Sequence, residues 1–389
     1  MPMKIVVAPD KFKGSLAAPG VAAAIERGIR RVDRDIAIDL CPMADGGEGT
    51  VAALVAATGG RLETQRVTGP LPEMKVDATF GILGDHQAAV VEMAAASGLA
   101  LLKPEDRNPL NTTTFGTGEL LMAAASMGVK QIVLGIGGSA TVDGGIGCAQ
   151  ACGLPVILEG GEPVSPTEPL CGRDLESVVL IKHGRGSSIE RVRITVACDV
   201  SNPLFGPDGA AEIFGPQKGA TPQQVRWLDQ ALHGLAERTG KLPEARTPGA
   251  GAAGGLGFAM LAFFGATLQS GSAIMIQATR LRDRLAGADL CITGEGRLDR
   301  QSLCGKAPIA VAELCKEIGV PCVALVGSIG EGAAGARDHG LQASFAIAEE
   351  SLPVQDRIGR AAELLEDAAA ALTQRYHDGW RPLSPSPPA

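Results

Sequence analysis

The stretch that decides the fold is ADLCITGEGRLDRQSLCGKAPIAVAELCKEIGVPCVALVG, residues 288–327. It begins with a short apolar run that predicts a strand, and a polar, glycine-rich loop follows. A segment with helical periodicity comes next, and a second apolar run ends the stretch. Two buried strands joined by a helix are typical of a β–α–β unit in a parallel sheet.

The same alternation opens the chain. KIVVA and IAIDLCPM predict strands, with helices from about Ser15 to Val32 and from about Gly49 to Ala57. It stops between residues 65 and 284, resumes with the stretch above, and ends with the strand ASFAIA and a helix from about Val354 to Tyr376. We therefore predict an α/β protein with a doubly wound parallel sheet domain of residues 1–64 and 285–380. An inserted α/β domain of residues 65–284 interrupts it, and residues 381–389 read as a disordered tail.

Composition excludes several classes of protein. A net charge of -8 and 3% aromatic residues argue against a surface for nucleic acid or an anionic membrane. The N-terminal apolar run is too short for a signal peptide, and the uncharged residues 247–279 are nearer to a buried helix than to a membrane span. The nine cysteines form no C-x-x-C pair. We expect a cytoplasmic protein with reduced thiols that binds small molecules.

Every polar, glycine-rich loop of the split domain follows a predicted strand. These loops are PDKFKGS, ADGGEGT, TGEGRLD and GSIGEG. Open α/β sheets bind ligands at the carboxyl ends of their strands, where the strand order reverses. In the common 2-1-3-4-5 order, PDKFKGS and TGEGRLD face each other across that crevice.

PDKFKGS has the chemistry of an anion site. Lys11 and Lys13 lie beside Gly14 and Ser15, which is the expected N-cap of the first helix. A helix N-terminus and two ammonium groups attract phosphate. The alternative is a basic surface turn in which Ser15 only caps the helix.

ADGGEGT places Asp45 and Glu48 around Gly46 and Gly47. Carboxylates on a glycine turn can hold Mg²⁺ or accept a proton from a hydroxyl group. A turn with a helix-capping acid has the same composition and is the alternative.

A third glycine loop, GIGGSATVDGGIG, spans residues 135–147 and contains Gly137, Gly138, Ser139 and a single acid, Asp143. It is not a P-loop, but GIGGSA fits G-x-G-x-x-A, and Glu159 follows at about the spacing of a dinucleotide site. An NAD-dependent oxidoreductase is therefore a rival hypothesis. Asp143 counts against it, since a carboxylate repels a pyrophosphate unless a divalent cation lies between them. A tight turn capped by Asp143 is the structural alternative.

Three other stretches are considered as sites. Asp199 and Asn202 follow the predicted strand RITVACDV, and Lys218 lies at a later glycine turn. These groups suit contacts with a metal or a substrate hydroxyl, or else a capped loop. The stretch GAGAAGGLG reads better as a close-packed helix entry than as a ligand site. Arg357 and its neighbours near the C-terminus read as a solvated helix face.

Seven motifs in order resemble the type I glycerate kinase family of bacteria: PDKFKGSL, PMADGGEGT, GIGGSATVDGG, CDVSNPL, FGPQKGA, GAAGGLG and TGEGRLDRQSLCGKAP. The resemblance runs from Lys4 to about residue 375. It implies ATP-dependent phosphorylation of glycerate, commonly at the 2-hydroxyl, and a flavodoxin-like domain interrupted by a second domain. Lys11 and Val142 stand where many relatives have serine and asparagine.

Our hypotheses for the individual residues follow from phosphoryl-transfer chemistry. Asp199 or Asp45 accepts the proton of the D-glycerate hydroxyl, with Asp199 favoured. Asp143 and Glu295 hold Mg²⁺ with ATP. Arg297 binds the glycerate carboxylate. The remaining predicted contacts to phosphate or substrate are Lys11, Lys13, Ser15, Gly46, Gly47, Gly137, Gly138, Ser139, Asn202, Lys218 and Lys306. A module that senses nucleotides without turnover is a second rival.

Overall fold

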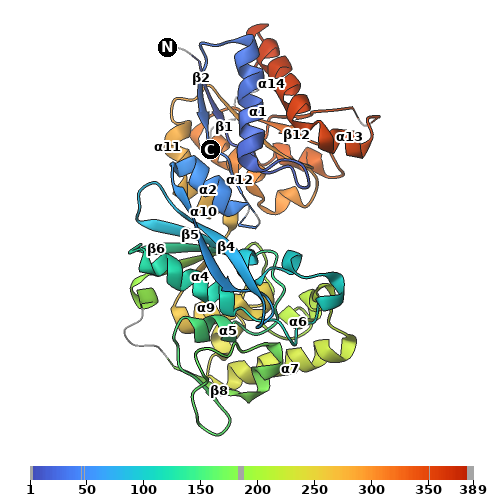
Figure 1. Cartoon of the computed structure of the whole chain (residues 1–389). Coiled ribbons are helices and arrows are strands. Elements are labelled where there is room, and N and C mark those ends of the chain that lie inside the picture. Colours follow the sequence, from blue (N-terminus) through green and yellow to red (C-terminus); the bar gives the residue numbers. More distant parts are fainter. Residues whose placement is uncertain (1–2, 45, 48, 183–187, 350, 383–389) are drawn as a thin grey trace. The chain divides into compact units, whose positions relative to one another are not determined.

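The computed structural model describes residues 3–44, 46–47, 49–182, 188–349 and 351–382. The chain folds into two compact units, and each is described by itself. The first unit contains residues 1–45, 52–59 and 272–389, and the second contains residues 46–51 and 60–271. In Figure 1 the blue and the orange-to-red ribbons accordingly belong to one unit, and the cyan-to-yellow ribbons to the other.

The first unit is built on a five-stranded parallel sheet with the order β13-β12-β11-β1-β2. Along the chain this is the order 2-1-3-4-5. The strands are β1 (Lys4–Val7), β2 (Ala37–Leu40), β11 (Leu290–Glu295), β12 (Cys322–Val326) and β13 (Ala343–Ala346). All residues of β11 and β12 are buried, as expected for parallel strands covered on both faces.

The strand order reverses at β1, which pairs with β2 on one side and with β11 on the other. Helices cover the sheet, and α1 and α14 lie side by side (Figure 1). Gly28 permits this close packing, because a Cβ there would lie 2.2 Å from the carbonyl oxygen of Glu366. The helices of this unit are α1 (Ala18–Val32), α2 (Thr50–Thr58), α10 (Gly271–Ala278), α11 (Leu281–Leu285), α12 (Ala307–Ile318), α13 (Val354–Gly359) and α14 (Ala361–His377), of which α2 and α10 each begin in the second unit.

Two expectations about helix ends are wrong. Helix α1 begins at Ala18 with Ala17 as its N-cap, and Pro19 lies in its first turn, where a missing N–H costs nothing. Ser15 caps nothing there, and its Oγ donates instead to the carbonyl oxygen of Ile358 at 2.7 Å. The C-terminal helix is also two helices, because Arg360 leaves the helical conformation between α13 and α14.

The second unit contains a six-stranded mixed sheet with the order β10-β9-β6-β5-β4-β3. β3 and β4 are antiparallel to their neighbours, whereas β5, β6, β9 and β10 run parallel. The strands are β3 (Arg61–Thr68), β4 (Lys75–Ile82), β5 (Ala88–Glu92), β6 (Gln131–Gly135), β9 (Arg193–Ala197) and β10 (Thr267–Gln269). The helices are α3 (Ala94–Ser97), α4 (Phe115–Ser126), α5 (Ile146–Ala151), α6 (Ala210–Phe214), α7 (Pro222–Arg238), α8 (Leu242–Ala245) and α9 (Ala252–Phe264).

The dinucleotide pattern does not form a dinucleotide-binding unit. A Rossmann motif needs the strand before Glu159 to pair in parallel with the strand before the glycine loop. That strand, β7 (Val156–Leu158), instead pairs antiparallel with β8 (Val178–Ile181) in a separate two-stranded sheet. The pattern match that supported an oxidoreductase is therefore misleading.

The GAGAAGGLG stretch is a close-packed helix entry, as the sequence favours. A Cβ at Gly254 would lie 1.9 Å from the carbonyl oxygen of Thr141, and one at Gly257 would lie 2.3 Å from that of Gly249. The helix that follows, α9, packs in the hydrophobic core of the second unit. Among the described residues, no helix is long and apolar enough to cross a membrane.

Candidate active site

Two carboxylates lie at the carboxyl ends of the central strands of the first unit. Glu295 is the last residue of β11, and Asp10 follows β1. The backbone N–H of Asp10 donates to the carbonyl oxygen of Gly294 at 2.8 Å, which fixes the two strand ends together. The pair therefore lies where the strand order reverses, the usual ligand position in an open α/β sheet.

Glu295 is poised to meet a ligand. Its side chain is 6% exposed, and its Oε1 has no hydrogen-bond partner among the described residues. Burial raises the pKa of Glu295 to about 7, opposed by a hydrogen bond with Ser302 and the charge of Lys306. Asp10 raises the pKa further. A buried, unpaired carboxylate oxygen is costly unless a cation or donor arrives to satisfy it.

A cavity of about 520 Å³ opens at the same edge of this sheet. The loops after β1, β11 and β12 contribute Lys13, Arg297 and Ser328, and α13 closes another side. The volume is in the range of small-molecule and cofactor sites.

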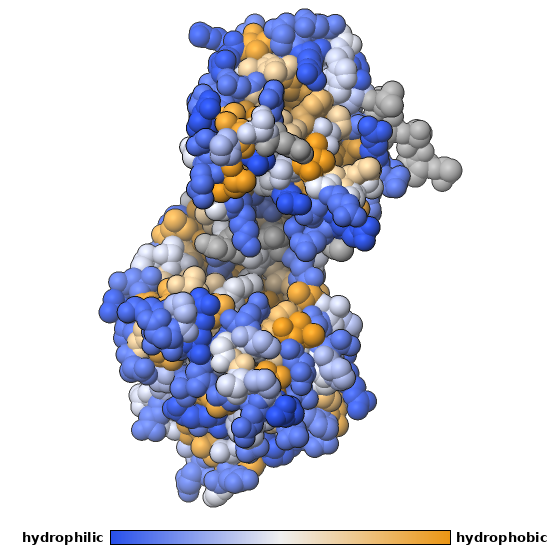
Figure 2. Space-filling model, turned by 90° about the vertical axis from the view of Figure 1, so that its right-hand side faces the viewer, coloured by the Kyte–Doolittle hydropathy of each residue, from blue (hydrophilic) through white to orange (hydrophobic). Residues whose placement is uncertain are grey.

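Three large apolar side chains are exposed at the rim of this cavity. Ile329, Val354 and Ile358 line it and are 42%, 58% and 39% exposed. Figure 2 shows hydrophobic residues in patches on a largely hydrophilic face. Arg357 lines the cavity too, and its Nε is buried with no hydrogen-bond partner in the described part of the chain. Arg357 is thus half-buried at the cavity, whereas Arg360 and Glu363 of the same predicted helix face are exposed. Apolar rims with a few cationic groups suit a ligand that has a flat ring and an anionic end.

The other predicted cations of this unit are distributed around the same edge. The Lys11 backbone N–H donates to Asp10 Oδ1 at 2.6 Å, while Lys13 is exposed at the cavity. Lys306 is the N-cap residue of α12, near enough to Glu295 to lower its pKa. Arg297 pairs with Asp299 at 3.2 Å and is 65% exposed.

The second unit gathers glycines at the carboxyl edge of its own parallel strands. A Cβ at Gly46 would lie 2.7 Å from the Cβ of Ala197, at the end of β9. A Cβ at Gly137 would lie 3.1 Å from the Cα of Gly47. The structure thus brings the ADGGEGT and GIGGSA loops together, with little room for a side chain at Gly137. Asp45 and Glu48 lie outside the described residues.

The loop of Gly137, Gly138 and Ser139 offers free donors. Gly138 has a φ of +73°, and both glycines are exposed. No acceptor among the described residues bonds to the backbone N–H groups of these three residues. Successive unpaired N–H groups around a left-handed glycine form a concave nest for an anion.

Beneath this loop lies a buried lysine. Lys218 is 2% exposed, and its Nζ donates to Ser139 Oγ and to the carbonyl oxygen of Thr141, both at 2.7 Å. Burial lowers the pKa of Lys218 to about 7, and the charge of Asp143 opposes that shift. Because Lys218 occupies a lone pair of Ser139, the Ser139 hydroxyl proton is left to donate to a ligand.

Asp143 has a different environment from the one a metal ligand needs. It is 0% exposed, and its Oδ2 accepts from the backbone N–H and the hydroxyl of Thr114 at 2.8 and 2.7 Å. Its Oδ1 accepts from the N–H of Gly145 at 3.1 Å. Burial raises the pKa of Asp143, and these hydrogen bonds oppose the shift. The carboxylate holds two loops together, so we no longer propose it as a metal ligand.

Asp199 and Asn202 lie on the loop after β9. Asp199 is exposed, and its Oδ1 accepts from the backbone N–H of Gly271 at 3.0 Å. Asn202 Nδ2 donates to the carbonyl oxygen of Asp208 at 2.8 Å, which is the contact of a capped loop.

Sequence reasoning missed two acids. Asp10 is 5% exposed at the end of β1, and Glu92 ends β5, where its Oε1 accepts from the N–H of Val51 at 2.7 Å. The signal available for both was their position, since each acid ends or follows a buried parallel strand.

The model of the glycerate kinase family matches residues 5–377. The chain belongs to this family. It is 46% identical to a glycerate kinase of Halalkalibacterium halodurans over 94% of this chain and 96% of that one. It is also 46% identical to the glycerate 2-kinase of Escherichia coli K12, over 89% and 90% of the two chains.

A solved structure agrees. The crystal structure of a Salmonella typhimurium LT2 protein, provisionally named glycerate kinase 2, superposes with a TM-score of 0.86. That protein is 42% identical, and the match covers 97% of this chain and 99% of the other.

Proposed function

We infer that this chain transfers the γ-phosphoryl group of ATP to a hydroxyl group of glycerate. The family match over residues 5–377 carries the inference, since relatives of nearly equal length are named glycerate kinases. The acidic carboxyl edge of the first unit supports it, because phosphoryl transfer relies on positioning and on neutralised charge.

The first unit is a flavodoxin-like domain that the second unit interrupts. Its 2-1-3-4-5 strand order supports this assignment, as does its assembly from separated segments of chain.

ATP binds in the cavity of the first unit. The adenine ring lies against Ile329, Val354 and Ile358, whose exposed apolar surface it covers. The phosphates lie toward Lys13, Arg297 and Arg357, where cationic groups line the cavity. This assigns Arg297 to phosphate rather than to the glycerate carboxylate.

Magnesium fits the carboxylates of the same edge. Glu295 has a buried oxygen without a partner in the described ranges, and the nearby Asp10 is also buried. Mg²⁺ prefers such oxygen donors. When bound with ATP, the ion supplies neutralising charge to the phosphates. Lys11 and Lys306 add positive charge there.

Glycerate binds at the carboxyl edge of the second unit. The free N–H groups of Gly137, Gly138 and Ser139 hold its carboxylate, and the Ser139 hydroxyl donates to the same group. Asp199, exposed beyond β9, accepts the proton of the reacting hydroxyl. Asp45 stays a second candidate for that base.

The product is 2-phosphoglycerate, made from D-glycerate. Its support is the relative named glycerate 2-kinase at 46% identity. ADP release from ATP is measured with D-glycerate, without it, and with EDTA, and ³¹P NMR then locates the phosphate. We expect release that needs both glycerate and metal, with the phosphate on carbon 2. Folded protein that releases no ADP refutes the function, and phosphate on carbon 3 refutes the regiochemistry alone.

The nucleotide cavity is tested separately by Val354→Asp. The introduced carboxylate replaces apolar surface against the adenine ring and repels the phosphates. We therefore expect the KM for ATP to rise about tenfold, with the KM for glycerate unchanged. Leu62→Asp is the matched control, since Leu62 is 54% exposed in the other unit. If Val354→Asp and Leu62→Asp change the KM for ATP equally, the adenine ring binds elsewhere.

A further inference from the structure

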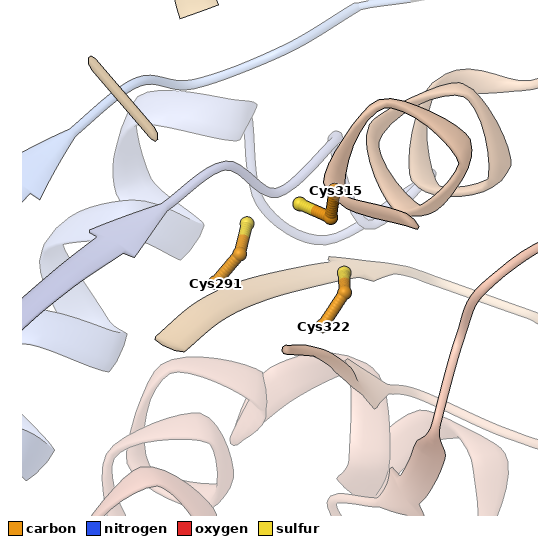
Figure 3. A group of neighbouring side chains, drawn as sticks. All are labelled: Cys291, Cys315 and Cys322. Atoms are coloured by element: carbon orange, nitrogen blue, oxygen red, sulfur yellow. The ribbon is translucent and has the colours of Figure 1, made fainter. Parts of the chain in front are cut away.

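Three thiols meet inside the first unit, away from the carboxylates described above. The Sγ atoms of Cys291, Cys315 and Cys322 all lie within 4.8 Å of one another. Figure 3 shows the three side chains converging from β11, α12 and β12. Cys291 and Cys322 are register partners on neighbouring parallel strands, so the backbone itself fixes two of the three.

The cluster is dry, and no charged side chain of the described residues influences its thiols. All three side chains are 0% exposed. Hydrogen bonds from Cys291 and Cys322 lower the pKa of Cys315 to about 5, and no lysine, arginine or carboxylate contributes to that shift. The hydrogen bond with Cys315 raises the pKa of Cys291. Any net charge on the three sulfur atoms stays without a counter-ion among the described residues and is costly.

We propose that Cys291, Cys315 and Cys322 form a binding site for trivalent arsenic. Arsenous acid reacts with three thiols: three As–S bonds form, three As–O bonds break, and three water molecules leave with the thiol protons. No electron is transferred. The product has three sulfur ligands around one atom and no net charge, which suits a buried cluster without ionic partners.

Other thiophilic ions fit less well. Zinc in structural sites takes four ligands, and the described residues offer three here. Monovalent copper selects soft sulfur ligands, but with three thiolates it leaves two negative charges in an apolar core.

Access comes from the ends of the secondary-structure elements. Cys322 begins β12, Cys291 is the second residue of β11, and Cys315 lies in the last turn of α12. The exposed residues Asp289 and Gly319 lie only a few positions away. Ends of elements open locally far more easily than the fold unfolds, so a small neutral molecule can enter.

The test is native mass spectrometry of the full chain after incubation with arsenite and a monothiol reductant. We expect one arsenic atom per chain, with loss of three protons. Alkylation of the treated protein after denaturation, followed by peptide mapping, should show Cys291, Cys315 and Cys322 protected together. This mapping uses the wild-type chain, so it does not depend on the folding of a variant.

Two variants complete the experiment. Cys315→Ser should abolish arsenic binding. Cys148→Ser should leave it unchanged, although Cys148 is also buried and lies against the thiol of Cys152 in the other unit. No bound arsenic, protection of other cysteines, or equal binding by Cys315→Ser would overturn the proposal. Binding of copper but not arsenite would overturn it as well. Each outcome is independent of kinase activity.

Discussion

Asp143 and Glu295 carry the same charge and received the same predicted role, yet the structure places them in opposite situations. Each is buried and lies at or beyond the end of a central strand in its unit, with 0% exposure for Asp143 and 6% for Glu295. Asp143 accepts from Thr114 twice and from Gly145. Glu295 keeps an oxygen to which no described residue donates a hydrogen bond.

The difference teaches that hydrogen-bond saturation, rather than burial, separates a structural acid from an available one. Burial raises the pKa of both groups. A carboxylate whose lone pairs meet fixed donors is stabilised by the fold and has little left for a ligand. A carboxylate with an orphan oxygen costs stability until a cation arrives, as is common in functional sites.

The largest expected effect belongs to Asp143→Asn. An amide turns an N–H donor toward the donors of Thr114 or Gly145, so we expect a loss of about 3 kcal/mol or more in the free energy of unfolding. Urea denaturation measures it, with the exposed Asp77→Asn as control. The kcat of the folded variant should stay within about twofold of the wild type. A stable variant with kcat lowered a hundredfold would restore Asp143 to the metal site.

Glu295→Gln should have the opposite effect, with kcat lowered and stability kept. It removes the negative charge with which Glu295 holds Mg²⁺ during phosphoryl transfer, so we expect kcat to fall by about 10²-fold. The free energy of unfolding should hold or rise, because a buried charge is replaced by a neutral group. Steady-state kinetics and denaturation are compared with Glu331→Gln, an exposed acid on the loop after β12. If Glu295→Gln unfolds easily and keeps its kcat, the two acids have been assigned the wrong way round.

The first unit was the more predictable of the two from sequence. Its strands are short, and the central strands β1, β11 and β12 are buried apolar runs that alternate with helices, so the periodicity changes at each boundary. The second unit begins with β3 and β4, whose faces are partly exposed and polar. Their antiparallel pairing has no helix between the strands, so the alternation that reveals parallel units is missing.

The sequence predicted which loops form the candidate site, but not which of their side chains are available to a ligand. Glycine loops after strands identify the sheet edge, and the Gly46 contact needs a residue without a Cβ. Whether an acid in such a loop is saturated depends on distant partners, and Thr114 lies 29 residues from Asp143. The prediction of Ser15 as a helix N-cap failed for the same reason, because its partner Ile358 comes from the other end of the chain.

A smaller effect on activity is expected at Ser139, at the carboxyl edge of the second unit's sheet. Ser139→Ala removes the hydroxyl that Lys218 orients toward a ligand, so we expect kcat/KM for glycerate to fall about tenfold. The exposed Ser126→Ala, on the end of α4, is the control in steady-state kinetics. The KM for ATP should not change. If ATP binding weakens instead, the Gly137–Ser139 loop holds phosphate and not the glycerate carboxylate.

The smallest expected effect is on the pH dependence of stability, and it concerns Lys218, whose charge interacts with Asp143. Lys218 has its pKa lowered to about 7, whereas an unfolded lysine keeps its proton to about pH 10. Between these values the unfolded chain binds the extra proton, so this group makes the fold more stable as pH rises and costs stability as pH falls toward 7. We expect the wild type to gain about 1–2 kcal/mol relative to Lys218→Met between pH 7 and 9. Titrating thiols affect both proteins alike, so the difference between the two denaturation series isolates Lys218. Parallel series would mean that Lys218 stays protonated and balances Asp143, making that acid half of a buried ion pair.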